Sequence, residues 1–248
     1  MDKVTLSDFR SSLARLKETD SDYTIVGGLA VGQWGEALLT PDERRSFSLP
    51  IRSKDIDIRA SKDVTMMLLR NLKEEGAIPS TIVKRIPKDP RMSFPSVAIP
   101  VRLIREKGEL RTTVEGLTGL PLLDQQTPLG IKWYGSRIPY GDLYLLDPCS
   151  LLVCKLNALH TRPPGESGND KVHAEILSLV IPRFIAKALH RHREQGDPYH
   201  PGADATHMLS FLERDPWDVL LPPEQKNAVV DACEQFRLRA PDDVGTPG

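Results

Sequence analysis

The chain has 248 residues, of which 40% are hydrophobic and 27% are charged, a balance typical of globular proteins. Its formal net charge is −1, which excludes a global electrostatic field that would draw it to nucleic acid or to a membrane surface. No run of about 18 uninterrupted apolar residues occurs, and the N-terminus lacks the basic-then-apolar order of a signal peptide. We therefore expect a soluble, cytoplasmic protein with no membrane partner.

The first 147 residues mix helical and extended patterns that turn residues separate. One helix has Ser61 as its N-cap and Gly76 as its stop signal. Residues 40–53 hold two prolines and several charges without a period, which predicts an inserted loop. Helices are expected over 7–18, 29–39 and 61–76, and extended segments over 22–28, 54–61, 80–86, 96–104, 109–117 and 128–146.

From Pro148 onward the pattern becomes helical, and Pro182 should kink or split the second helix of this part. These helices are expected over 148–160, 169–195, 203–215 and 223–239. The chain should thus be an α+β protein, with an α/β domain over 1–147, a helical domain over 148–240 and a disordered tail over 241–248. The alternative is one core that both halves share.

The three cysteines are an odd number, and no spacing among them suits a zinc site. Cys149 and Cys154 fall within an apolar helical run, and Cys233 lies far from both. Reduced, buried thiols of an intracellular protein fit these features best.

The stretch KDIDIRAS, residues 54–61, places two acids on one face of a strand. Strand side chains alternate between faces, so Asp55 and Asp57 lie on one face and Ile56 and Ile58 on the other. The isoleucines can enter a core, whereas the acids are left about 7 Å apart along the strand. Two carboxylates placed in this way can hold Mg²⁺, a hard cation that prefers oxygen ligands.

A glycine pair, Gly27 and Gly28, stands between a short apolar strand and a predicted helix. Glycine lets the backbone approach a phosphate closely, and a helix start offers free N–H groups and the positive end of the helix dipole. Together with a cation held by the two acids, this pair predicts a site for a nucleoside triphosphate and for phosphoryl transfer.

The order of strand, Gly-Gly, helix and then Ser53-x-Asp55-x-Asp57 on the next strand resembles the nucleotidyltransferase fold. Within that superfamily the chain is most similar to the abortive-infection (AbiEii-type) nucleotidyltransferase toxins and their relatives. The run CKLNALHTR, with Lys155 and Arg162, is similar to the K-L-x-A-x-x-x-R helix of that group, and NDKVHAEIL to its D-x-x-D segment, with Asp170 as the first acid. The resemblance spans roughly residues 22–180, discontinuously.

The resemblance implies a nucleotidyltransferase-like mixed sheet with flanking helices, followed by a helical region. It also implies Mg²⁺-dependent transfer of NMP from an NTP to a hydroxyl acceptor. The third acid of the family lies in an h-D-h-L strand, which the run Val114–Leu117 matches best. Asp55, Asp57 and Glu115 would then hold a two-metal Mg²⁺ site, and Glu115 would help to deprotonate the acceptor.

The resemblance also assigns the residues that would hold the triphosphate. These are Gly27, Gly28, Ser53 and Lys155. Asp170 would orient Lys155 or Arg162 through a charged hydrogen bond.

Three departures from the family pattern stand out. Arg four residues before the first acid is replaced by Ile51, and Arg52, one step nearer, would point to the opposite face of a strand. The third acid is Glu115 rather than Asp. The second acid of the D-x-x-D segment is replaced by His173, which we expect not to be a metal ligand.

The acceptor and the partners follow only from the resemblance and from the distribution of charge. The toxin group suggests RNA, such as a tRNA end, as the acceptor, and a separate antitoxin protein as a partner. Residues 84–111 hold eight Lys or Arg against three acids, which is compatible with RNA, whereas residues 203–248 hold nine acids against four bases. The alternatives are a small-molecule, antibiotic-type nucleotidyltransferase and a catalytically inactive binding or regulatory protein.

Overall fold

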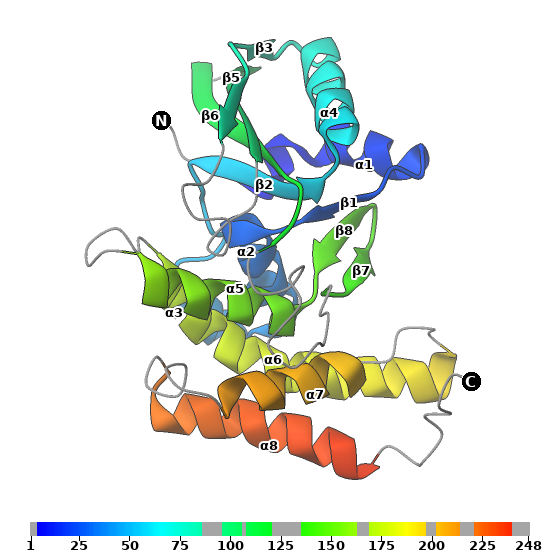
Figure 1. The fold of residues 1–248 in the computed structure, drawn as a ribbon, viewed down its shortest axis with the longest axis vertical. Coiled ribbons are helices and arrows are strands. Elements are labelled where there is room, and N and C mark those ends of the chain that lie inside the picture. Colours follow the sequence, from blue (N-terminus) through cyan, green and yellow to red (C-terminus); the bar gives the residue numbers. More distant parts are fainter. Residues whose placement is uncertain are drawn as a thin grey trace.

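The computed structural model describes residues 4–85, 96–105, 108–120, 135–162, 169–196, 202–213 and 221–239. It shows an α+β protein in which a mixed sheet and its flanking helices stand above a group of longer helices (Figure 1). This confirms the predicted fold class. The predicted tail over 241–248 lies outside the described residues. Within the described part of the chain, no helix combines the length and the apolar character needed to cross a membrane.

Among the described residues the sheet has eight strands, in the order β3-β5-β6-β2-β1-β8-β7, with β4 paired to β5. The pairs β2–β6 and β1–β8 are parallel, and the other pairs are antiparallel. The strands are β1 (Tyr23–Ile25), β2 (Asp55–Ala60), β3 (Ile78–Pro79), β4 (Val83–Arg85), β5 (Ser96–Arg105), β6 (Gly108–Leu117), β7 (Arg137–Tyr140) and β8 (Leu143–Leu146).

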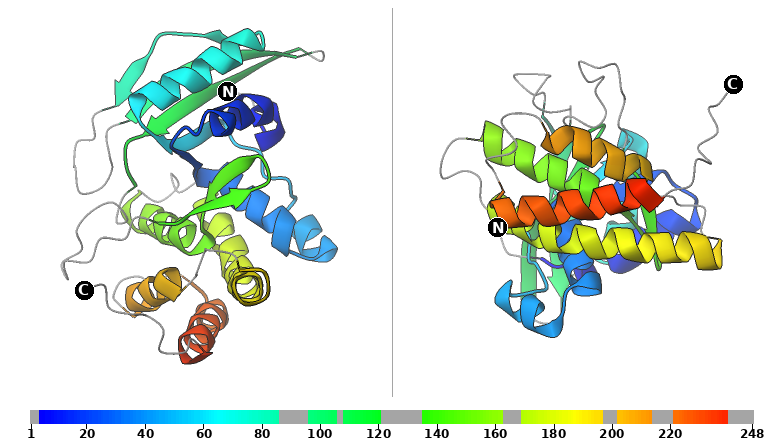
Figure 2. Two further views of the ribbon diagram at one scale, coloured as in Figure 1. Left: turned by 90° about the vertical axis from the view of Figure 1, so that its right-hand side faces the viewer. Right: turned by 90° about the horizontal axis from the view of Figure 1, so that it is seen from below.

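The helices fall into two groups along the chain. A short turn η1 (Leu6–Asp8), α1 (Arg10–Glu18), α2 (Gly27–Leu38), α3 (Pro41–Ser46) and α4 (Lys62–Glu74) belong to the sheet half. The second group is α5 (Pro148–Thr161), α6 (Asp170–Gln195), α7 (Gly202–Leu212) and α8 (Pro223–Arg239). Two further views show α4 over the sheet and the second group side by side at the opposite end (Figure 2).

Strand β2 shows why the sequence forms this sheet. Ile56 and Ile58 are fully buried, while Asp55 and Asp57 on the other face are only half-buried. The following helix α4 begins as predicted, because the Ser61 side chain accepts a hydrogen bond from the backbone N–H of Val64. The acids of β2 are therefore carried by a strand whose other face is anchored in the core.

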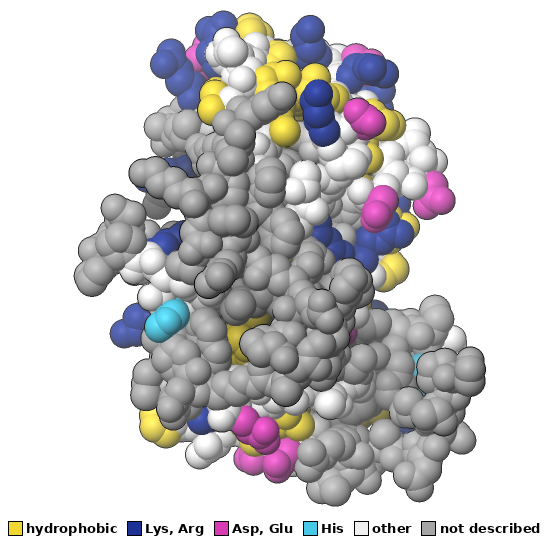
Figure 3. Space-filling model, in the orientation of Figure 1, with side chains coloured by type: hydrophobic (Ala, Val, Ile, Leu, Met, Phe, Trp, Pro, Cys, Tyr) yellow, Lys and Arg dark blue, Asp and Glu magenta, His cyan; other side chains and the backbone are white. Residues whose placement is uncertain are grey.

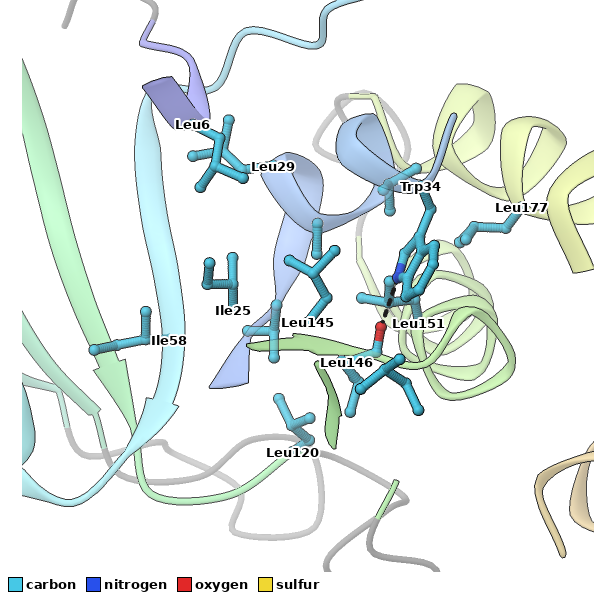
Figure 4. Packing of buried hydrophobic residues seen from close by; sticks show 14 of the residues in the cluster. Leu6, Ile25, Leu29, Trp34, Ile58, Leu120, Leu145, Leu146, Leu151 and Leu177 are labelled. Atoms are coloured by element: carbon cyan, nitrogen blue, oxygen red, sulfur yellow. Dashed lines mark hydrogen bonds between the residues drawn. The ribbon is translucent and has the colours of Figure 1, made fainter. Parts of the chain in front are cut away.

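One hydrophobic cluster contains buried residues from both halves of the chain. Trp34 on α2 connects them: its indole N–H donates to the carbonyl oxygen of Leu146, at 2.8 Å (Figure 4). Its ring also packs edge-on against Phe184 of α6. The boundary between residues 147 and 148 stays a prediction, because side chains from both sides of it pack in the same cluster.

One local expectation is wrong, and another is wrong in part. The segment 40–53 contains the helix α3, which Thr40 begins by accepting from the N–H of Glu43, with Pro41 in its first turn. The expected kink at Pro182 stays a prediction, but the helix α6 is not split there and runs unbroken through this residue. It packs against α2, α5 and α8, and this tertiary burial offsets the backbone hydrogen bond that proline removes.

Within the described residues, Cys149, Cys154 and Cys233 form no disulfide. Cys149 and Cys233 are buried in the core, as expected of reduced thiols, and Cys154 is half-buried.

Candidate active site

Three carboxylates meet where the parallel strands β2 and β6 lie side by side. The register places Asp57 opposite Glu115, and Asp55 lies on the same face of β2 two residues earlier. One carboxylate oxygen from each of the three residues lies within 4.8 Å of the others. The acids that the sequence analysis selected on separate strands therefore form one cluster.

The cluster is electrostatically crowded. Burial, together with the charges of Asp55 and Glu115, raises the pKa of the Asp57 carboxyl to about 7. Lys155 and Arg162 act in the opposite direction. Three oxygen ligands that repel one another in this way fit a hard divalent cation such as Mg²⁺.

Two serine hydroxyls bind two of the three acids, Asp55 and Glu115. Ser53 Oγ donates to Asp55 Oδ1 at 2.9 Å, and Ser96 Oγ donates to Glu115 Oε1 at 2.7 Å. The sequence analysis assigned Ser53 to the triphosphate, and in the structure its hydroxyl binds the first acid. It missed Ser96, whose position depends on the antiparallel register of β5 and β6.

The glycine pair forms the first turn of α2, beside the acids. Gly27 has φ +68°, and a Cβ at this position would collide with the Asp57 carboxylate. A Cβ at Gly28 would lie 2.9 Å from Cε1 of His173. Among the described residues, Val26 at the start of this helix makes no side-chain cap, and the N–H groups of a helix's first turn suit an anion.

A second cluster brings positive charge to the site from α5 and α6. Asp170 accepts a hydrogen bond from Lys155 Nζ at 2.8 Å and another from Arg162 Nη1 at 2.6 Å. The Asp170 side chain is 4% exposed and that of Lys155 is 13% exposed. The predicted orienting contacts of Asp170 are thus present, and they involve both cations.

These clusters line one cavity of about 620 Å³. The predicted site residues on its wall are Gly28, Ser53, Asp55, Asp57, Glu115, Lys155 and Asp170. Gly27 lies next to the Asp57 carboxylate, because a Cβ at Gly27 would collide with it. The wall also contains Arg52, Lys54, Arg162, Asn169 and His173, so the acids and several cations line the same cavity.

His173 is the residue whose position the sequence analysis did not foresee. It lies on α6 with only 7% of its surface exposed, and its Nδ1 is buried and has no hydrogen-bond partner among the described residues. Burial, together with the charge of Lys155, lowers its pKa to about 3. The available signal was its place in the chain, three residues after Asp170, where the resembling family carries an acid.

Comparisons with known proteins add little to this geometry. No protein-family model matches the chain, and a search of curated proteins finds no match. Among solved structures, JHP933 from Helicobacter pylori covers 94% of this chain and 90% of its own, with 12% identity and a TM-score of 0.43. A second H. pylori structure, described as a candidate nucleotidyltransferase, covers 94% of this chain and 93% of its own, with 12% identity and a TM-score of 0.40.

The antibiotic-resistance factor ANT(2'')-Ia covers 77% of this chain and 93% of its own, with 13% identity and a TM-score of 0.38. Similarity at this level carries no argument about chemistry. The function of this chain must therefore be argued from the residues of its cavity.

Proposed function

We propose that the chain is a metal-dependent nucleotidyltransferase, which moves NMP from an NTP to a hydroxyl acceptor. The observation that carries this proposal is the convergence of Asp55, Asp57 and Glu115, with carboxylate oxygens within 4.8 Å of one another, beside the first turn of α2. The sequence resemblance to the nucleotidyltransferase fold supports the same assignment.

The residues around the acids suit a triphosphate. The first turn of α2 presents backbone N–H groups at Gly28, and Lys155 and Arg162 add two positive charges. Asp170 holds both cations through its two carboxylate oxygens, so they keep a fixed direction before the nucleotide arrives. These residues bind and orient the phosphates.

The residues that would hold Mg²⁺ are Asp55, Asp57 and Glu115. When bound, the metal offsets the negative charge that develops on the transferred phosphoryl group. The chain prepares this site by fixing Asp55 through Ser53 and Glu115 through Ser96.

In the reaction the acceptor oxygen forms a bond to the α-phosphorus. The bond between that phosphorus and the oxygen bridging to the β-phosphate breaks, and pyrophosphate leaves. Glu115, which the Ser96 hydroxyl orients, takes the proton of the attacking hydroxyl.

RNA, such as a tRNA end, is the acceptor that the sequence resemblance favours, and an antitoxin protein is the partner it implies. Of the basic run at 84–111, the described Arg102 and Arg111 lie toward the tip of the β5–β6 hairpin and contact Glu109. Arg111 is four residues from Glu115, about 13 Å along the strand. Figure 3 shows basic side chains at this end of the molecule, mixed with hydrophobic ones. A long acceptor such as RNA could contact the arginines of the β5–β6 hairpin and reach the carboxylates at the same time.

The test is incubation with each α-labelled NTP, Mg²⁺ and total RNA. The native protein is compared with Asp55→Ala plus Asp57→Ala, and with Asp63→Ala, which removes an exposed acid on α4. We expect label on RNA with the native protein and with Asp63→Ala, but not with the double variant. Label with all three would refute the site. Label on no RNA, together with no change in melting temperature with any Mg–NTP, would favour an inactive binding protein.

A further inference from the structure

The imidazole of His173 lies against the first turn of α2. Its Cε1 atom is 2.9 Å from the position that a Gly28 Cβ would take, and its two ring nitrogens, Nε2 and Nδ1, are 3.5 and 3.8 Å from that position. Because Cε1 is bonded to both nitrogens, both lie on the edge of the ring that faces the glycine. His173 also lines the cavity that contains the acids and Lys155.

This imidazole has a hydrogen-bonding group to offer. Within the part of the chain that the structure describes, Nδ1 is buried and has no hydrogen-bond partner. A neutral imidazole carries one N–H donor, and a buried polar group without a partner costs free energy that a ligand can recover. The ring remains neutral near pH 7 because burial and Lys155 lower its pKa.

We infer that His173 is a phosphate-binding residue, whose ring N–H donates to a non-bridging oxygen of a triphosphate bound at the first turn of α2. This inference rests on the proposed function, because it assigns the nucleotide's phosphates to that end of the cavity. It assigns a role to a residue at which the sequence departs from the D-x-x-D segment.

The exchange of an acid for a neutral donor has a clear electrostatic consequence. A carboxylate at position 173 would repel a polyanion and would compete with it for Lys155. A neutral imidazole does neither, and it adds a donor next to the N–H groups of Gly28. Lys155 can then donate hydrogen bonds to Asp170 and to the bound phosphates.

The test is calorimetric titration with Mg–tripolyphosphate, which has the phosphates of an NTP but no nucleoside. His173→Leu removes the donor, His173→Asn keeps an N–H near the place of the unpartnered Nδ1, and His190→Leu makes the same change as His173→Leu at an exposed position farther along α6. We expect His173→Leu to weaken binding about tenfold or more. His173→Asn should stay within about threefold of the native protein, and His190→Leu should not differ from it.

A second measurement follows binding in the unaltered protein. The Cε1–H resonance of His173, assigned from its loss in His173→Asn, should shift on addition of Mg–tripolyphosphate. A resonance that stays in place, or a His173→Leu variant that binds as the native protein does, overturns the inference and leaves the proposed function standing. Failure of the native protein to bind both Mg–tripolyphosphate and every Mg–NTP overturns both.

Discussion

The carboxylate of Asp57 occupies the space that a side chain at Gly27 would need. The first glycine of the pair is therefore required by two independent features, its φ of +68° and its contact with a site acid. The glycine and the acid lie on different elements, α2 and β2, so each restricts what the other position can hold.

Gly27→Ala tests this relationship. The variant must accept a left-handed backbone and must also displace Asp57, so we expect a loss of about 2–4 kcal/mol in the free energy of unfolding. Gly196→Ala is the matched control, because its φ is +64° and nothing lies within 4 Å of an added Cβ. It should lose only about 1 kcal/mol. Equal losses in chemical denaturation would show that the Asp57 contact is unimportant.

The contact between Gly28 and His173 predicts a coupled pair. The nearest atoms to a Gly28 Cβ all belong to the His173 ring, so Gly28→Ala should be destabilising alone and much less so with His173→Ala. We expect a coupling energy of about 1–2 kcal/mol from a double-mutant cycle measured by denaturation. Additive losses would mean that the two residues are not in contact in solution.

Asp57→Asn should separate stability from metal binding. In the presence of a chelator at about pH 8, the ionised Asp57 is destabilising, because burial and its acidic neighbours raise its pKa to about 7. The neutral amide should therefore raise the melting temperature by about 2–4 °C. Saturating Mg²⁺ should stabilise the native protein and leave the variant unchanged. Asp63→Asn should resemble the native protein in both conditions, and a full Mg²⁺ effect in Asp57→Asn would count against the site.

Asp170 and Asp142 allow a buried and an exposed ion pair to be compared in one molecule. Asp170 binds Lys155 and Arg162 with a side chain only 4% exposed, whereas Asp142 binds Arg10 with side chains 42% and 48% exposed. Asp170→Ala leaves Lys155 without its buried partner and should cost about 3–5 kcal/mol. Asp142→Ala should cost less than about 1 kcal/mol. Urea denaturation of both variants measures the difference, and similar costs would contradict the burial of the first pair.

Stability should fall with rising pH because of Asp147, which accepts from the backbone N–H groups of Ser150 and Ser136. Burial, together with the charge of Asp204, raises its pKa from 3.8 to about 8. The folded state therefore binds a proton that the unfolded state has released. The free energy of unfolding that this proton contributes is fully present below about pH 4 and is lost as the pH rises toward 8.

Asp204→Asn removes the second charge and should recover about 1 kcal/mol at the alkaline end of this range. The exposed Asp231→Asn on α8 is the control and should leave the pH profile of the unfolding free energy unchanged. An identical slope in all three proteins would exclude this source of pH dependence.

Much of the fold and of the candidate site could be predicted from sequence where the pattern is local. The alternation around Asp55 and Asp57 gives the strand and its two faces, and the glycine pair marks the start of a helix. The proposed third acid, Glu115, lies beside Asp57 in the parallel register. The strand and the helix start could be predicted because each depends on a short period or on the order of adjacent elements, whereas Glu115 was selected by the family resemblance and its role stays a prediction.

The features that were missed depend on contacts between distant segments. Helix α3 is a short helix whose Glu43 is bound by Arg183 of α6, at 2.7 and 2.8 Å, and such a contact leaves no periodic signal. The unbroken course of α6 through Pro182 depends on its neighbours. The place of His173 beside Gly28 requires α6 to pack against α2, which no local pattern reveals.

The parallel pairing of β2 with β6 also sets the order in which the acids can meet during synthesis. Asp55 and Asp57 leave the ribosome well before Glu115, whose strand β6 pairs with both β2 and β5. A nascent chain that ends before β6 thus lacks the complete carboxylate set, and one that ends before α6 lacks Asp170 and His173. Any activity of this cavity would begin only after residue 173 has been made.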